Sequence, residues 1–237
     1  MTPELLVANL IVCLAGFVQT TTGVGFAMIA VPMLLLVDLK YAPGPALFAM
    51  LFLAIAMSIG AWNDVDREAF PFLFPGLAVG TIVGSVLVGM LSEQNFGLVF
   101  GLIVLGGIAL GLMGYAPEQT PRVDAAGGVV SGAMGTMSGI HGPPLAVLYQ
   151  RAEPTTARAT IAFVFVVASS LSLISLSAAG LFGRQEVVAG LSLLPGLAVG
   201  FLLARSGRQF ISDGAARYGM LGIAAVSAIV LIIRSLG

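Results

Sequence analysis

The sequence predicts an all-α integral membrane protein, a polytopic helical bundle of two homologous repeats whose first helices are interrupted. Three observations support this. First, 58% of the 237 residues are hydrophobic and only 9% are charged, whereas a soluble domain carries about 25% charged residues. Second, uncharged apolar stretches near the ~20 residues that cross a bilayer recur from end to end. Third, two short sequence elements occur twice in the same order.

The apolar stretches define eight segments between charged or proline-rich breaks. They cover residues 4–37, 45–62, 70–91, 96–115, 124–149, 157–182, 186–204 and 214–234. The connections are too short to hold a soluble domain, so we expect one membrane domain. The amino terminus lacks a positively charged n-region and a small-residue cleavage site, which predicts that the first segment is retained.

An internal repeat is indicated by a hexapeptide that recurs unchanged, Pro75–Gly80 and Pro195–Gly200, at an offset of 120 residues. At an offset of 116, the element that begins at Gly16 matches the one that begins at Gly132. Two matches in register predict a duplication, with repeat 1 over residues 1–116 and repeat 2 over 121–237. Secondary transporters commonly have such repeats and bind substrate where corresponding segments meet near the midplane.

Segments 4–37 and 124–149 are expected to break. A straight helix over the first would be about 50 Å long at ~1.5 Å per residue, more than a bilayer requires. Glycine-rich sequence lies inside each, at 20–25 and 135–144. Non-helical backbone at membrane depth survives where protein or a water-filled cavity satisfies its polar groups, so both breaks should face inward.

The broken segments therefore predict an anion site, because free N–H groups at helix starts attract negative charge. The expected substrate-binding residues are Gln19, Thr20, Thr21, Thr22, Gly23, Gly25, Thr136, Ser138, Gly139, His141 and Gly142. His141, the only histidine, has two open interpretations: it donates to an anion or titrates with a coupled proton, or it is a hydrogen-bonded core histidine. Small residues in such clusters also let helices approach closely.

Three basic residues, Lys40, Arg151 and Arg158, follow the interrupted segments and could form an anion vestibule. The alternative is that they are ordinary positively charged loop residues.

Other function classes are disfavoured by composition. The formal net charge is −1, without a basic block that could follow a phosphate backbone, so nucleic acid is not expected as a partner. Cys13 is the only cysteine, so it is expected to pack rather than ligate a metal. Paired intramembrane carboxylates and a nucleophile with a base are lacking. Glu118, Asp124 and Glu153 fall at segment ends, where solvated positions are expected. We therefore expect no enzyme, no metal and no cofactor.

The two glycine-rich elements resemble those of the TauE/SafE sulfite exporter family, over essentially the whole chain. The first copy runs from Gly16 to Pro32 and contains Gly23-Val24-Gly25-Phe26 and Val31-Pro32, and the second runs from Gly132 to Pro144 and contains the stretch that begins at Ser138. The resemblance implies a secondary transporter that exports sulfite or a related organosulfur anion across a bacterial inner membrane. A coupled proton and a homo-oligomer are further expectations. A channel, and a scaffold subunit that transports nothing, are the alternatives.

Two topologies remain open. If both interrupted segments cross the bilayer, there are eight spans and the halves are parallel. If both fold back as hairpins, each half has three full spans and the repeats are inverted. The second model places seven basic residues (67, 122, 151, 158, 205, 208, 217) opposite three (40, 184, 234). The positive-inside rule favours this model, with both termini outside.

Overall fold

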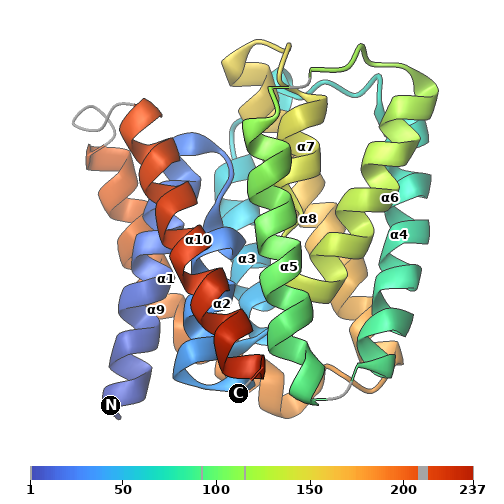
Figure 1. Cartoon of the computed structure of the whole chain (residues 1–237). Coiled ribbons are helices and arrows are strands. Elements are labelled where there is room, and N and C mark those ends of the chain that lie inside the picture. The colour runs from blue at the N-terminus through green and yellow to red at the C-terminus, as the bar shows by residue number, and fades with distance from the viewer. Residues whose placement is uncertain (1, 92, 115, 208–212, 237) are drawn as a thin grey trace.

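The computed structural model describes residues 2–91, 93–114, 116–207 and 213–236, and within these ranges the only regular elements are helices. Ten of them are α-helices (Figure 1). The first half contains α1 (Pro3–Thr22), α2 (Phe26–Val37), α3 (Gly44–Ser58), α4 (Phe70–Met90) and α5 (Glu93–Leu112). The second half contains α6 (Pro121–Ser138), α7 (Gly142–Leu148), α8 (Pro154–Ala178), α9 (Arg184–Gly207) and α10 (Asp213–Leu236).

The predicted fold class is confirmed. Five described segments are long and apolar enough to cross a membrane, namely Pro3–Thr22, Leu39–Ser58, Phe70–Met90, Pro154–Ala178 and Arg184–Ser206. Many large apolar side chains on their outer faces are exposed, such as Met90 at 77% and Ile174 at 66%. Exposed apolar surface on this scale requires lipid as the surrounding medium.

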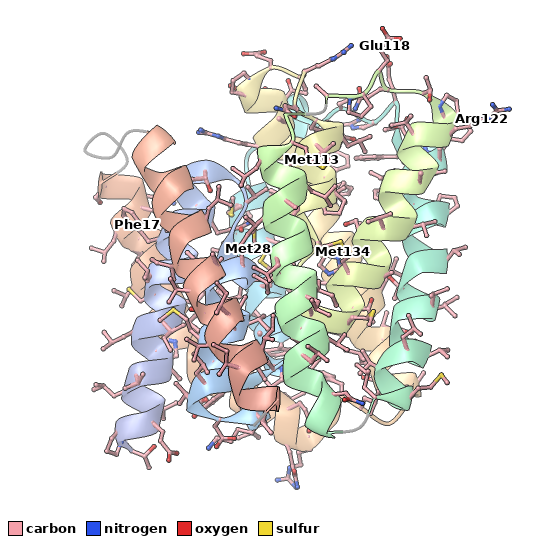
Figure 2. The ribbon with its side chains drawn as sticks, viewed as in Figure 1. Phe17, Met28, Met113, Glu118, Arg122 and Met134 are labelled. Atoms are coloured by element: carbon pink, nitrogen blue, oxygen red, sulfur yellow. The ribbon has the colours of Figure 1, made fainter. Side chains whose placement is uncertain are left out.

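Both interrupted segments fold back as hairpins. Lys40 Nζ, just beyond the end of α2, lies 3.8 Å from Glu4 Oε2 at the start of α1. Arg151 Nη1, beyond α7, lies 3.8 Å from Glu118 Oε1, just before α6. The eight-span alternative does not describe this structure, because each segment returns to the side on which it began. The first hairpin starts at the lower end in Figure 1, beside both termini, whereas Arg122 marks the start of α6 at the upper end (Figure 2).

The repeated hexapeptide forms the closest helix crossings in the bundle. A Cβ at Gly76 or Gly80 of α4 would overlap the carbonyl oxygen of Ala125 or Val129 of α6. In the other half, Gly196 and Gly200 of α9 lie in the same way against α1, on the carbonyls of Asn9 and Cys13. Asn9 and Cys13 stand 116 residues before Ala125 and Val129. Each hairpin thus packs, backbone against backbone, on the hexapeptide helix of the opposite half.

Asn9 contributes a second contact to the α1–α9 crossing. Its side chain donates from Nδ2 to Ser192 O over 3.0 Å and accepts from Gly196 N–H over 2.7 Å. Pro195 lies inside α9, where proline disturbs the helical hydrogen bonds. The buried Asn9 amide therefore takes the place of a helical hydrogen bond that α9 lacks near Pro195. The same contact fixes the position of α1 along α9.

Gly80→Leu is expected to destabilise the protein by about 1–3 kcal/mol or more, because the added side chain must displace the α6 backbone. The matched control is Gly89→Leu on the same helix, since a Cβ there meets nothing within 4 Å. Thermal unfolding in detergent measures both. Equal losses of melting temperature in the two variants would contradict the close crossing.

Candidate functional site

The two breaks are formed by glycines in the left-handed region of backbone space. Gly23 (φ 88°) and Gly25 (φ 119°) separate α1 from α2. Gly139 (φ 77°) ends α6, and His141 precedes α7. Residues with a Cβ rarely adopt such angles, so the predicted interruptions are confirmed at the expected positions.

Gln19 braces the first break. Its Nε2 donates to Gly23 O over 3.0 Å, and its Oε1 accepts from Phe26 N–H over 2.8 Å. The side chain is 1% exposed. The first N–H groups of a helix lack intrahelical acceptors. The Gln19 amide therefore supplies an acceptor for the first N–H of α2 and a donor for the carbonyl of Gly23. The predicted anion ligand Gln19 therefore holds the site together in this structure.

His141 braces the second break through a reciprocal pair of hydrogen bonds with Ser131 of α6. The ring Nδ1 lies 3.0 Å from Ser131 O, and Ser131 Oγ donates to His141 O over 3.0 Å. The ring lies over Gly135, where any Cβ would overlap it. His141 is 1% exposed, and its Nε2 has no hydrogen-bond partner among the described residues.

The two braces exchange places between the halves. At the offset of 116, Gln19 corresponds to Gly135 and Gly25 to His141. In the first hairpin the polar side chain comes from the long helix and the break carries glycine. In the second, the break carries the polar side chain and the long helix carries glycine. In each hairpin, one polar side chain occupies the space between the long helix and the break.

The predicted hydroxyl residues mostly bond to backbone. Thr20 donates to Gly16 O over 2.7 Å, and Thr21 and Thr22 both donate to Val18 O. Ser138 donates to Met134 O over 2.7 Å. Thr136 instead shares a 2.7 Å hydrogen bond with Ser172 of α8.

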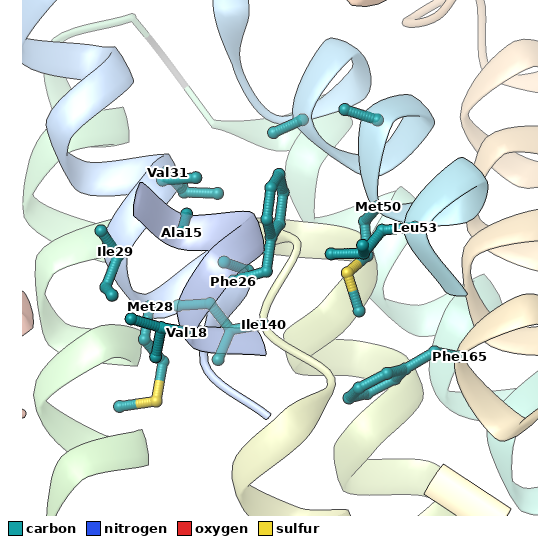
Figure 3. Packing of buried hydrophobic residues seen from close by; sticks show 14 of the residues in the cluster. Ala15, Val18, Phe26, Met28, Ile29, Val31, Met50, Leu53, Ile140 and Phe165 are labelled. Atoms are coloured by element: carbon teal, nitrogen blue, oxygen red, sulfur yellow. The ribbon is translucent and has the colours of Figure 1, made fainter. Parts of the chain in front are cut away.

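A small enclosed cavity, here called the central cavity, lies between the two breaks. Five predicted residues line it, from both hairpins: Gln19, Gly25, Gly139, His141 and Gly142. Phe165 and Met50 also line it (Figure 3). The cavity volume is about 10 Å³, close to the roughly 10–15 Å³ that one buried water requires. The structure thus brings the two breaks together around a space no larger than about one water molecule.

Two larger cavities adjoin the first break, and Arg158 of α8 lines both. One, the Gln150 cavity, has about 280 Å³ and also contains Thr22 and Val24. The other, the Arg205 cavity, has about 690 Å³ and also contains Thr20. The aliphatic stem of Arg158 lies against Gly23. Met28 and Pro143 line both the Gln150 cavity and the central cavity, so these two residues form the partition between them (Met28 is labelled in Figure 2).

The other two predicted vestibule cations lie away from these cavities. Lys40 Nζ is 2.6 Å from Asp38 Oδ2, and this hydrogen bond lowers the pKa of the Asp38 carboxyl. Arg151 pairs with exposed Glu118. The structure therefore brings Arg158, but neither Lys40 nor Arg151, to the breaks.

Several residues were not anticipated. Arg205 and Gln150 line the cavities beside Arg158, although nothing in the sequence distinguishes them from loop residues. The solvated position expected for Asp124 is wrong: it is 5% exposed, and its Oδ1 lacks a partner among the described residues. The reason is that α6 begins at Pro121 and packs on α4 from its first turn.

Comparison with known proteins agrees with this architecture. The family model for the sulfite exporter TauE/SafE matches residues 8–231 of the 237. This chain belongs to the TauE/SafE family. TauE/SafE proteins are membrane transporters, so the predicted family and a multi-pass transport protein are confirmed. No curated protein and no solved structure matches the chain.

Gln19→Ala is expected to destabilise this TauE/SafE protein by about 1–3 kcal/mol, because Gly23 O and Phe26 N–H would be left buried without partners. Exposed Gln119→Ala serves as the control, and chemical or thermal unfolding in detergent is the measurement. A Gln19 variant as stable as the control would show that the brace is dispensable.

Proposed function

We propose that this chain exports sulfite, or a related small organosulfur anion, across a bacterial inner membrane. The observation that carries the proposal is the central cavity, where two broken hairpins from different halves meet. Family membership supports the transport of a small anion, and the breaks supply backbone donors at the centre of the bundle. Coupling to a proton and assembly into a homo-oligomer stay predictions.

The anion is held by groups that carry no full charge. Ala27 and Met28 stand in the first turn of α2 and line the central cavity. Amide groups in the first turn of a helix have no intrahelical acceptor and carry the positive end of the helix dipole. A site built from such donors binds an anion without a buried cation and so can release it. Because Gly139 and Gly142 have no side chains, the anion can come close to the backbone N–H groups of the second break.

Arg158 recruits the anion from one end of the protein. That end holds most of the described arginines: Arg67, Arg122, Arg151, Arg158 and Arg205. Lys40 lies at the other end, beside Glu4. The positive-inside rule assigns the arginine-rich end to the cytoplasm. The two Arg158 cavities then collect substrate from the cytoplasm, as export requires.

The two halves are proposed to be inverted repeats. The support is that the first hairpin starts at the end with the termini and the second at the arginine-rich end. The matched crossings of Gly76 on Ala125 and Gly196 on Asn9 add to it. Substrate sites of such transporters lie at the interface of the repeats, which is where the breaks meet.

A carrier fits this geometry better than a channel. The central cavity is enclosed and nearly filled, whereas conduction needs a continuous path with several sites. Saturable sulfite flux supports the carrier, and flux proportional to concentration supports a channel. A scaffold subunit would produce neither.

Arg158→Gln is expected to reduce saturable sulfite uptake into proteoliposomes by about tenfold or more, because Arg158 is half-buried and a hydrogen bond to a charged group is worth roughly 1.5–3 kcal/mol. Arg151→Gln is the control, since Arg151 lies at the same end in an exposed pair with Glu118. Equal uptake by the two variants would remove Arg158 from the path.

Sulfite is expected to raise the melting temperature of the detergent-solubilised protein. A ligand at 100 times its Kd stabilises the folded state by about 2.7 kcal/mol. Chloride at the same ionic strength is the control. A melting temperature that responds equally to both salts would count against a sulfite site.

A further inference from the structure

The hydrogen bonds of His141 fix which ring nitrogen carries the proton. Ser131 O lies 3.0 Å from Nδ1, and a carbonyl oxygen can only accept. Nδ1 is therefore the donor. In the neutral ring, Nε2 is then an unprotonated acceptor. The Ser131 hydroxyl, which donates to His141 O, holds the residue in this orientation.

The Nε2 atom has nothing to accept from within the described part of the protein. It is buried and without a partner, and His141 lines the central cavity. A buried acceptor without a donor is costly. The unpaired Nε2 therefore marks a position where a bound ligand would supply a hydrogen-bond donor.

Among the described residues that line the central cavity, His141 is the only titratable or charged one. Gln19 from α1 has its amide committed to the first break. Met28 from α2, Met50 from α3 and Phe165 from α8 are apolar, with Phe165 6.4 Å from the histidine ring. Ser131 from α6 donates to backbone. The protonation of an anion bound here is therefore read by Nε2 alone among the described residues that line the cavity.

We infer that the central cavity, which in this conformation holds no more than about one water, widens to take each anion together with one proton, which is held at or against Nε2 of His141. This rests on the proposed function and deepens it. A fully deprotonated anion would face the Nε2 lone pair and be repelled. A hydrogensulfite ion instead donates its proton to Nε2. Equivalently, the ring takes a proton and donates it to sulfite. Both descriptions contain one anion and one proton, so the proton balance is the same.

The first test reads the histidine directly and does not depend on transport. Because His141 is the only histidine, ¹⁵N-histidine labelling gives a single pair of ring nitrogens by NMR in the purified, detergent-solubilised chain. The expected free state has its proton on Nδ1 and a bare Nε2. Sulfite, added until the melting temperature no longer rises, should shift Nε2 toward the protonated or hydrogen-bonded value. A free ring protonated on Nε2, or an Nε2 signal unchanged by bound sulfite, would overturn the inference.

The second test follows protons and sulfite together in proteoliposomes that contain a trapped pH dye, with empty liposomes subtracted. Wild type should move one proton with each sulfite. Its initial rate at fixed, subsaturating total sulfite should fall about tenfold per pH unit once hydrogensulfite becomes the minor form. Ser131→Ala keeps the backbone carbonyl and should retain this profile. His141→Gln removes the titrating nitrogen and should lose it.

Two transport outcomes would refute the inference: wild-type sulfite flux without proton movement, or a His141→Gln variant with the wild-type pH profile. If wild type carries no sulfite at all, the proposed function fails instead. The NMR result still decides the protonation of His141 in that case, because it requires only binding.

Discussion

Backbone contact between helices of opposite halves is the constraint on which this structure depends. Gly76 and Gly80 bring α4 against α6, and Gly196 and Gly200 bring α9 against α1. Lipid gives apolar helices little reason to prefer each other over the surrounding chains, so small residues and close packing decide which helices associate. With α1 and α6 anchored in this way, the ends of both hairpins must meet inside the bundle.

In the interior of the bundle, polar groups gather at the two breaks. Each break leaves backbone groups that lipid cannot satisfy. Gln19 and His141 each brace one break, and hydroxyls of Thr22, Ser131 and Ser138 bond to further backbone groups there. The amide of Gln19 satisfies both a donor and an acceptor of the backbone. The imidazole satisfies only one group through its ring and leaves Nε2 open. This unpaired nitrogen beside the cavity has no equivalent in the first hairpin.

Much of the fold could be predicted from the sequence because lipid imposes simple rules. Segment length and glycine clusters indicated the helices and the two breaks, whereas the repeated hexapeptide did not reveal which helices it would pack against. Side-chain partners could not be predicted in this way. Ser131 bonds to His141 across a turn that no periodicity describes, and Asn9 bonds to Ser192 across 183 residues. Lys40, Arg151 and Arg158 all follow the interrupted segments in the sequence. Because each hairpin folds back, Lys40 and Arg151 instead pair with the acidic residues Glu4 and Glu118 near the start of their own hairpins.

The glycine crossings also determine which parts of the protein can shift against each other. Where backbones touch, no layer of side chains remains to change rotamer, so α1 with α9 and α4 with α6 behave as rigid pairs. Each pair contains one helix from each half. Relative motion is left to the interfaces without such glycine crossings, such as α3 with α8. The mechanical units of this protein are therefore not the two halves of its sequence. If the two mixed pairs separate, Gln19 of α1 moves with one, and His141, which is bonded to Ser131 of α6, moves with the other.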